Sequence, residues 1–308
     1  MKTFQSSLHK AIRRRAPLSS ITNAMRLVNG AGDDLDGLLI DCYDKHLHAQ
    51  ILSDHWNKEM PEICRTLTSC LPVEYLIVKS RRGLEIREEV LIGSRPQTIV
   101  EEYGIKFGVN LKEGLNCGLF LDMRHNRRMV GLFSKGKKVL NCFSYTCSFG
   151  LHARVGGACE VINVDISRKI LERGENNYQL NCLPTAAGEF IKADSVSFLK
   201  RAFKKENYFD VVILDPPSFA RYEGRVFQVK RDLPGLIASA VAVLNPGGSL
   251  LVTTNYSGID ASNLEQMLAR GLNGRRVAHI QRVSQDKDFI GSNSFKESYL
   301  VGIWVKFL

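Results

Sequence analysis

The sequence lacks several features, and each absence excludes a class of protein. No apolar run is long enough to cross a bilayer, so no transmembrane helix is predicted. No apolar stretch follows the basic residues 1–20, which excludes a secretory signal, and an organellar transit peptide is the less favoured alternative. We therefore expect a cytoplasmic protein that does not bind membranes.

The cysteines are too scattered for a disulfide framework or a zinc site. They form no C-x-x-C pair, and no histidine lies at metal-ligand spacing from two of them. In a chain of this size without an export signal, cysteines are typically reduced and mostly buried. The sequence predicts free thiols and no bound metal.

Negative charge is also scarce relative to positive charge. The 42 Lys and Arg residues and the 32 Asp and Glu residues give a formal net charge of +10 and an isoelectric point near 9.2. The basic residues gather in clusters at residues 9–15, 79–83, 124–128, 134–138, 199–205 and 274–282. Any one cluster is most simply a solvated surface, but together they favour a polyanionic partner such as RNA.

The apolar pattern divides the chain into three parts. Residues 1–20 are expected to form a basic N-terminal arm, flexible or loosely docked. Residues 21–110 contain short strands, one helix and tight turns, which is typical of a small, hairpin-rich α/β domain. Turn chemistry accounts better than a calcium loop for the acidic residues of this part, which are Asp33, Asp34, Asp36 and Asp41.

In residues 111–308, apolar strands alternate with helical segments. Parallel strands are expected over residues 137–143, 160–167, 189–194, 208–215 and 249–255. These strands lack period-two alternation, so both of their faces are covered, as in a doubly wound α/β fold. Two closing strands, 276–283 and 297–307, indicate an antiparallel edge. We predict a mostly parallel, seven-stranded sheet.

Two of these strands end in aspartates that point to a nucleoside site. Ligands of such sheets bind at the carboxyl ends of the strands. Asp165 ends the second strand, where a carboxylate accepts hydrogen bonds from ribose hydroxyls. Asp194 ends the third strand and is placed for an adenine amino group. The alternative for each aspartate is the N-cap of the following helix.

The fourth strand ends in the sequence Asp-Pro-Pro-Ser-Phe. The two prolines remove backbone donors and leave carbonyl acceptors, which makes a stiff strand end. Asp215 with Pro216 and Pro217 can hold an exocyclic amino group, while Phe219 offers a stacking face for a base. We predict these four residues to be catalytic; the alternative is that the prolines simply stop the strand.

Five longer motifs carry a family resemblance. They are "RLVNGAGDDLDGLLIDCY", "GLFLDMRHNR", "VLNCFSYTCSFGLHARVGGACEVINVDIS", "FDVVILDPPSFAR" and "ESYLVGIWV". The chain resembles the class I S-adenosylmethionine (SAM)-dependent methyltransferases, and within them the family of bacterial 23S rRNA methyltransferase I and the second domain of rRNA methyltransferase K/L. The resemblance implies a Rossmann-like methyltransferase domain over residues 111–308, SAM as cofactor and ribosomal RNA as partner.

The resemblance also implies the residues that hold the cofactor. The cofactor loop is not rich in glycine in this family and uses Asn141, Phe143, Ser144 and Tyr145. Cys147 stands where the family usually has glycine, and a positive φ there would cost a cysteine about 1 kcal/mol.

The remaining cofactor residues follow from the same resemblance. Phe120, Asp122 and Arg124 are expected to line the methionine side, with the Arg124 guanidinium holding the carboxylate bidentately. Asp165 would take the ribose, Ile166 would pack on adenine, and Asp194 would approach the adenine amino edge.

The sequence also bears on the methylated atom. The cytosine-C5 branch of the family uses a cysteine thiolate in a Ser-Cys-Ser-like element after the fifth strand. The corresponding residues 253–257, "TTNYS", contain no cysteine, which favours a nitrogen acceptor on a base. The family's N-terminal PUA domain is not seen before the hairpin domain, and its D-H-P element reads "DKDFIG" at 286–291.

Two alternatives stay open. One is a non-catalytic RNA- or ribosome-binding module that retains the fold. The other is a methyltransferase that acts on a protein or a small molecule. The oligomeric state is also open, a homodimer included.

Overall fold

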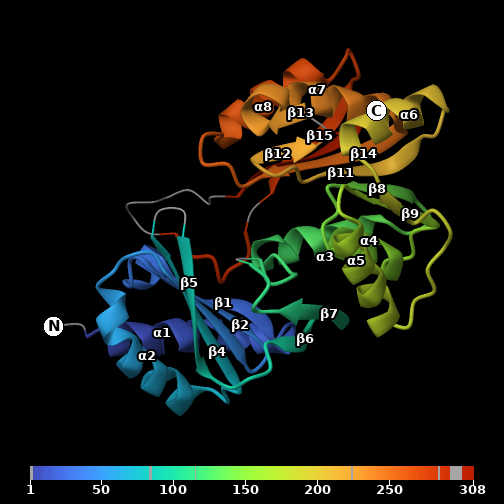
Figure 1. The fold of residues 1–308 in the computed structure, drawn as a ribbon. Helices are drawn as coiled ribbons and strands as arrows, with labels where there is room; N and C mark the ends of the chain where they lie inside the picture. Colours follow the sequence, from blue (N-terminus) through green and yellow to red (C-terminus); the bar gives the residue numbers. More distant parts are fainter. Residues whose placement is uncertain (1–2, 83–84, 115, 223–224, 284, 292–299) are drawn as a thin grey trace. The chain divides into compact units, whose positions relative to one another are not determined.

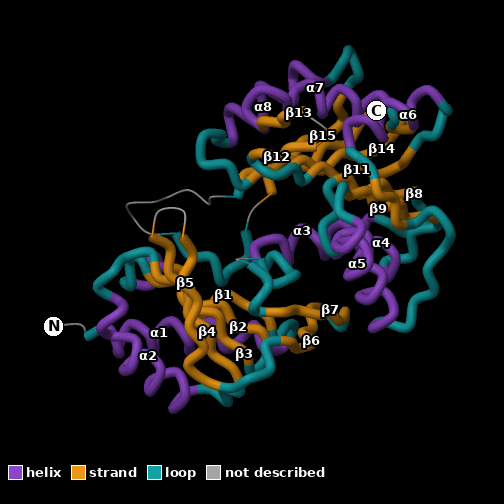
Figure 2. Tube along the Cα trace, in the orientation of Figure 1, coloured by secondary structure: helices purple, strands orange, loops and turns teal. Residues whose placement is uncertain are grey.

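The computed structural model describes residues 3–82, 85–114, 116–222, 225–283, 285–291 and 300–308 (Figures 1 and 2). The chain divides into two compact units, Met1–Arg124 with Asp286–Ser298 and His125–Gln285 with Tyr299–Leu308. The boundary expected after residue 110 thus lies after Arg124. In addition, a stretch near the end of the chain joins the first unit.

A five-stranded sheet forms the centre of the first unit, in the order β1-β2-β3-β4-β5. All neighbours are antiparallel except β3 and β4. The strands are β1 (Ala24–Asn29), β2 (Leu38–Tyr43), β3 (His46–Ile51), β4 (Tyr75–Arg82) and β5 (Glu85–Ile92). Helix α2 (Trp56–Cys70) makes the crossover that a parallel pair requires. A hairpin of β6 (Gln97–Glu102) and β7 (Ile105–Asn110) follows.

The N-terminal residues are a packed helix, α1 (Phe4–Arg15), so the prediction of a loose arm is wrong for them. Leu8 and Ala11 are buried in the same hydrophobic cluster as the sheet residues. Arg15 is buried as well, and its guanidinium donates to both carboxylate oxygens of Asp33 at 2.5 and 2.6 Å. The basic composition of the segment therefore conceals an amphipathic helix.

The second unit contains a seven-stranded sheet in the order β10-β9-β8-β11-β14-β16-β15. The first five strands are parallel, and β16 is antiparallel to both of its neighbours. The strands are β8 (Lys138–Cys142), β9 (Glu160–Asp165), β10 (Phe190–Lys192), β11 (Phe209–Leu214), β14 (Leu244–Thr254), β15 (Val277–Val283) and β16 (Val301–Phe307). The predicted sheet is confirmed; positions 297–299 of its last strand lie outside the described residues.

Helices cover both faces of this sheet (Figure 1). They are α3 (Arg124–Phe133), α4 (Ser148–Val155), α5 (Arg168–Leu180), α6 (Ser195–Lys204), α7 (Val229–Ala242) and α8 (Ala261–Gly271). Central strand residues such as Leu140 and Val212 are fully buried, because neither face of the sheet meets water. Among the described residues, no helix has the length and apolar character needed to span a membrane.

Candidate active site

The register of the second sheet brings the predicted carboxylates to one edge. Cys142 at the end of β8 pairs with Val164 of β9 and with Leu214 of β11. Asp165 and Asp215 each come one residue after these partners. The chain moves from β8 to β9 on one side, while β11 lies on the other side, so this edge holds the switch point at which α/β sheets bind ligands.

The loop from β8 to α4 has a strained backbone. Phe143, Tyr145 and Cys147 have φ values of 57°, 48° and 61°. A positive φ costs a non-glycine residue roughly 1–2 kcal/mol. Strain of this kind persists where the surrounding structure enforces it, commonly at binding sites. The loop therefore turns without glycine, as expected, and at the cost expected for Cys147.

Cys147 has a packing role. Its side chain is fully buried, and a Cβ atom on Gly174 of α5 would lie 2.4 Å from its Sγ atom. Burial raises the pKa of the Cys147 thiol far above its usual value, so the thiol is neutral. Cys147 therefore fills the space above a helical glycine and offers no thiolate for catalysis.

Asp165 is tied to the loop and keeps capacity for a ligand. Its carboxylate accepts hydrogen bonds from the backbone N–H of Tyr145 and of Ser167, both at 3.0 Å. Burial raises the pKa of Asp165, and these backbone hydrogen bonds act against the rise. A carboxylate has about four acceptor positions, so two ribose hydroxyls can be accommodated. The N-cap of α5 is Ser167, so the alternative considered for Asp165 does not apply.

Asp194 caps the helix that follows it, which is the alternative role considered for this residue. It is the N-cap of α6, and its Oδ2 atom accepts from the backbone N–H of Ser197 at 2.8 Å. Its contact with an adenine amino group stays a prediction. Ile166 follows β9 with 37% of its surface exposed, which leaves an apolar face for adenine.

Asn141 lies inside the sheet, below the loop. Its Nδ2 atom donates to Oδ1 of Asn163 at 2.9 Å, and Asn163 in turn donates to the Tyr178 hydroxyl. The backbone N–H of Ser144 donates to the Val164 carbonyl at 3.0 Å. These buried contacts fix the strand ends on which the loop rests, so Asn141 is placed as a support of the loop.

The Asp215 motif is held by the neighbouring strand. The hydroxyl of Thr253 donates to Oδ1 of Asp215 at 2.7 Å, and Thr253 is fully buried. The Ser218 hydroxyl donates to Oδ1 of Asn255 at 3.3 Å. The two motifs at the ends of β11 and β14 are therefore joined. Thr253 was not predicted as a site residue; its position directly after the apolar residues 250–252 was the available signal.

The aromatic residues of this motif lie on a hairpin, where a plain loop was expected. Phe219 begins β12 (Phe219–Tyr222), which pairs with β13 (Arg225–Gln228). Phe219 is 48% exposed, Pro217 is exposed and Pro216 is buried. The ring of Phe227 on β13 lies 6.0 Å from that of Phe143 in the cofactor loop. The hairpin thus connects the predicted acceptor site, residues 215–219, to the predicted cofactor loop.

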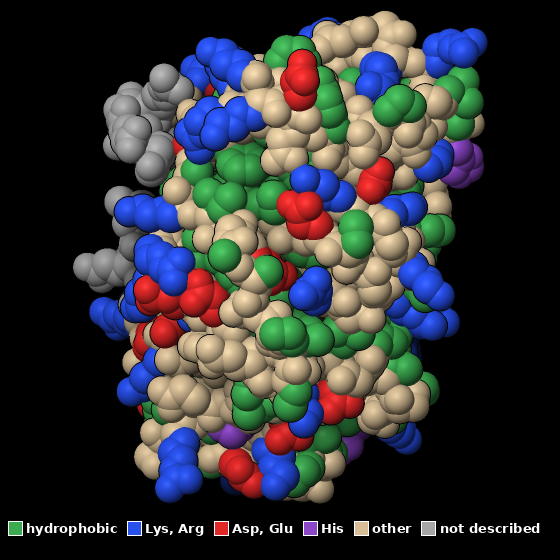
Figure 3. All heavy atoms as spheres, turned by 90° about the vertical axis from the view of Figure 1, so that its right-hand side faces the viewer, with side chains coloured by type: hydrophobic (Ala, Val, Ile, Leu, Met, Phe, Trp, Pro, Cys, Tyr) green, Lys and Arg blue, Asp and Glu red, His purple; other side chains and the backbone are tan. Residues whose placement is uncertain are grey.

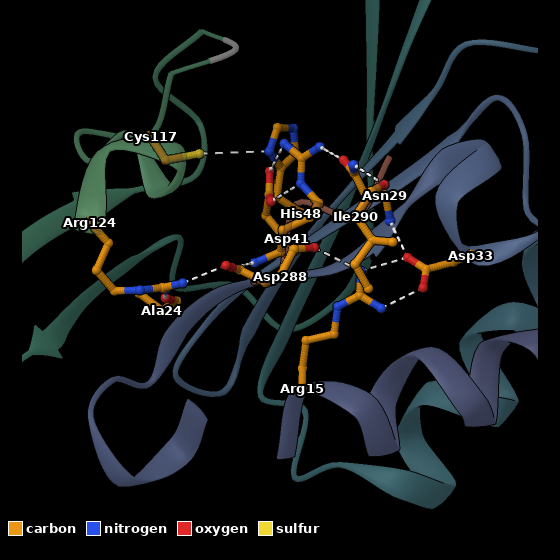
Figure 4. Close-up of polar contacts among 11 residues, drawn as sticks. Arg15, Ala24, Asn29, Asp33, Asp41, His48, Cys117, Arg124, Asp288 and Ile290 are labelled. Atoms are coloured by element: carbon orange, nitrogen blue, oxygen red, sulfur yellow. Dashed lines mark hydrogen bonds and ion pairs between the residues drawn. The ribbon is translucent and has the colours of Figure 1, made fainter. Parts of the chain in front are cut away.

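The three residues expected on the methionine side belong to the first unit. Phe120 is half-buried and Asp122 is buried, next to the short 3-10 helix η3 (Leu121–Met123). Arg124 is fully buried, and Figure 4 shows its guanidinium beside Asp288 and Ala24. It donates to Asp286, to Asp288 and to the backbone carbonyl of Ala24.

This arrangement does not fit the role expected for Arg124. Each guanidinium nitrogen has a protein partner, and the carboxylates of Asp286 and Asp288 already neutralise this fully buried charge, so Arg124 has no uncompensated charge for a cofactor carboxylate. Asp288 also accepts from the backbone N–H of Arg26 at 2.8 Å, and its carbonyl accepts from Arg15 (Figure 4). We therefore correct the assignment: Arg124 holds residues 286–288 in the first unit and is not retained as a cofactor ligand.

The strand order, the strained loop at the switch point and the carboxylate that follows β9 are the features expected of a class I SAM-dependent methyltransferase. Comparison with known proteins agrees. Residues 73–293 match the family model described as S-adenosylmethionine-dependent methyltransferase. The chain belongs to this family; it is an enzyme that uses SAM.

The relatives are more specific. The chain is 34% identical over 285 residues to ribosomal RNA large subunit methyltransferase I of Photobacterium profundum, covering 89% of this chain and 72% of that protein. It is 34% identical over 297 residues to the protein of the same name from Tolumonas auensis, covering 92% and 75%. A crystal structure assigned as a methyltransferase and solved with SAH has a TM-score of 0.90, at 27% identity, covering 98% of this chain and 80% of that one.

Proposed function

We propose that this methyltransferase transfers a methyl group to a nitrogen atom of a base in ribosomal RNA, in the cytoplasm. The observation that supports the substrate class is the name shared by relatives of which the chain covers about three quarters, ribosomal RNA large subunit methyltransferase I. The net charge of +10 suits a polyanionic substrate.

The thiols near the site support the nitrogen acceptor. Transfer to cytosine C5 needs a thiolate that attacks the base. Cys142 and Cys147 flank the cofactor loop, but both are fully buried. Burial raises the pKa of the Cys142 thiol to about 12 and that of Cys147 further. Neither thiol is therefore suited to covalent attack, and residues 253–257 supply no cysteine.

The site's own residues orient the acceptor. SAM supplies an activated methyl group on a sulfonium. Thr253 holds one carboxylate oxygen of Asp215 and so orients the carboxylate, which can accept from a base N–H. The exposed ring of Phe219 can stack on the base, and the Asp-Pro-Pro carbonyls add acceptors. Placing a nucleophile in line with the methyl group is worth several kcal/mol through orientation alone.

The test is methyl transfer from labelled SAM to ribosomal RNA purified from a strain that lacks this protein, followed by nucleoside analysis. An N-methylated nucleoside is the expected product. A labelled 5-methylcytidine would refute the nitrogen acceptor but would still support ribosomal RNA as the substrate. Label in protein or in small molecules, with none in RNA, would refute the substrate as well.

A further inference from the structure

The basic clusters of the sequence fall into two groups, those whose cations are buried in ion pairs and those whose cations lie on the surface. In three of them the structure buries cations: Arg15 is paired with Asp33, Lys79 with Glu88 and Arg124 with Asp286 and Asp288. These charges are neutralised inside the protein. The other three clusters, at 134–138, 199–205 and 274–282, belong to the second unit and remain largely on its surface.

The sheet topology gathers these three clusters at the amino-terminal edge of the strands, away from the cofactor loop. Lys135 and Lys137 precede β8, Lys204 and Lys205 precede β11, and residues 275–276 precede β15. Because β16 is antiparallel to β14, Lys306 near its end lies at the same edge, and its Nζ atom donates to the carbonyl of Gly247. In the upper part of Figure 3, Lys and Arg side chains lie among hydrophobic side chains and a few acidic ones.

The charges of this edge are poorly neutralised. Lys138 has an acidic partner, Glu160, at 3.0 Å. Arg275 donates to the neutral carbonyls of Leu244 and Asn245, at 3.2 and 3.0 Å, and its guanidinium lies over the Phe307 ring. Within the part of the chain that the structure describes, it has no ion pair with a carboxylate. For the remaining cations, the ion pairs of the described residues include none to a carboxylate. These cations are Lys135, Lys137, Lys204, Lys205, Arg276 and Lys306.

Two neighbours show direct repulsion. The pKa of Lys137 is lowered, by burial first and then by the positive charge of Lys306, while the negative charge of Asp210 acts against this shift. Two cations held close together lose this repulsion when an anion binds between them. The helix dipole accounts for Lys204 at the C-terminus of α6, but not for Lys137 or Lys306.

Exposed aromatic rings lie among these cations. Phe203 of α6 is 53% exposed and Tyr208, just before β11, is 37% exposed. They flank Lys204 and Lys205 in the chain. Cations that can follow a phosphate backbone, combined with exposed rings that can stack on bases, are the features of sequence-independent single-stranded RNA binding. An acidic protein or an anionic membrane would gain from the cations but has no bases for the rings.

We propose that this basic edge, defined by Lys135, Lys137, Lys204, Lys205, Arg276 and Lys306 with Phe203 and Tyr208, is a second RNA-binding surface. It holds RNA that extends beyond the methylated nucleotide, on the side of the sheet opposite the catalytic edge. The inference rests on the proposed function, because it takes the substrate to be RNA. It assigns the surface no part in the chemical step.

The test compares two triple variants of the full chain. K135Q/K204Q/K205Q removes three exposed cations from the basic edge, and K10Q/K58Q/K112Q removes three exposed cations from the first unit. Each is assayed on long ribosomal RNA and on a short fragment cut around the methylated nucleotide. For the edge variant, KM for the long RNA should rise about tenfold or more, and the slope of log affinity against log salt should fall by about 2, at roughly 0.7 per phosphate contact. Its kcat and its KM for the fragment should match those of the control variant.

A third variant, F203A, should weaken binding of the long RNA about tenfold through loss of base stacking. If the wild type methylates RNA but the edge variant keeps the control's KM and salt slope, the second surface is refuted and the proposed function stands. If the wild type neither binds nor methylates RNA, the proposed function itself fails. Binding of anionic vesicles that is lost in the edge variant, with RNA binding unchanged, would assign the edge to a membrane and overturn the proposal.

Discussion

The packing of Cys147 against Gly174 can be tested by a double-mutant cycle. Cys147→Gly removes a residue that is strained at φ 61° together with its buried thiol. Gly174→Ala adds a methyl group to α5 that would meet Sγ at 2.4 Å and Cβ of Cys147 at 2.9 Å. In the double variant both of these atoms are absent, and the nearest remaining atom is the carbonyl carbon of Thr146 at 3.4 Å.

The magnitudes follow from these contacts. Alanine in place of glycine within a helix is worth about 1 kcal/mol, whereas overpacking costs about 1–3 kcal/mol. Gly174→Ala alone should therefore lower the free energy of unfolding by about 1 kcal/mol. In the Cys147→Gly background the clash is gone, so the same substitution should raise it by about 1 kcal/mol. The coupling energy between the two positions should be about 2 kcal/mol.

The measurement is urea unfolding of the four proteins, followed by circular dichroism. A matched control is Gly235→Ala in α7, because a Cβ atom there meets nothing within 4 Å. This control should stabilise the protein by about 1 kcal/mol in both backgrounds. A coupling energy below about 0.5 kcal/mol would refute the view that Gly174 is present to make room for Cys147.

Three further predictions concern the site and the first unit. Because burial raises the pKa of Asp165, SAM affinity of the wild type should fall on acidification at a higher pH than for an ordinary aspartate; calorimetry across pH should show this, and Asp165→Asn should bind weakly with no such pH dependence. Thr253→Val should lower kcat about tenfold or more with an unchanged Kd for SAM, since the valine no longer orients Asp215; equal values of kcat in the two proteins would contradict this role. Burial lowers the pKa of His48 from 6.5 to about 4, so the neutral form is favoured in the fold and about 3 kcal/mol of stability should be lost as the pH falls from 6.5 to 4. Denaturation at several pH values checks this, and His48→Gln should flatten the profile between pH 6.5 and 4.

Local patterns were enough to predict the second unit. Its strands are continuous apolar runs because both faces of the sheet are covered, and residues such as Asp165 and Asp215 follow the runs directly. The sequence predicts strain at Cys147 if the loop requires a positive φ there. Only the backbone geometry shows that φ is positive at this residue.

The wrong predictions for residues of the first unit have a different cause. The partners of Arg124 lie 162 and 164 residues away in the chain, so no local pattern indicates that they neutralise it. The same holds for Arg15, whose carboxylate partner, Asp33, lies 18 residues further on. A cluster of basic residues looks alike in the sequence whether its charges are buried in ion pairs or exposed. Hence α1 was taken for an arm, and Arg124 for a cofactor ligand.

The most direct test of the account is to separate cofactor binding from methyl transfer with Asp215→Asn. The substitution keeps the size of the side chain but removes the charge that we propose to orient the acceptor, where β11 and β14 end side by side. Calorimetry should give a SAM affinity within about twofold of the wild type, while labelled methyl transfer to ribosomal RNA should fall about a hundredfold or more. Loss of SAM binding to the same extent as activity, or retention of full activity, would contradict the assignment of this edge of the sheet.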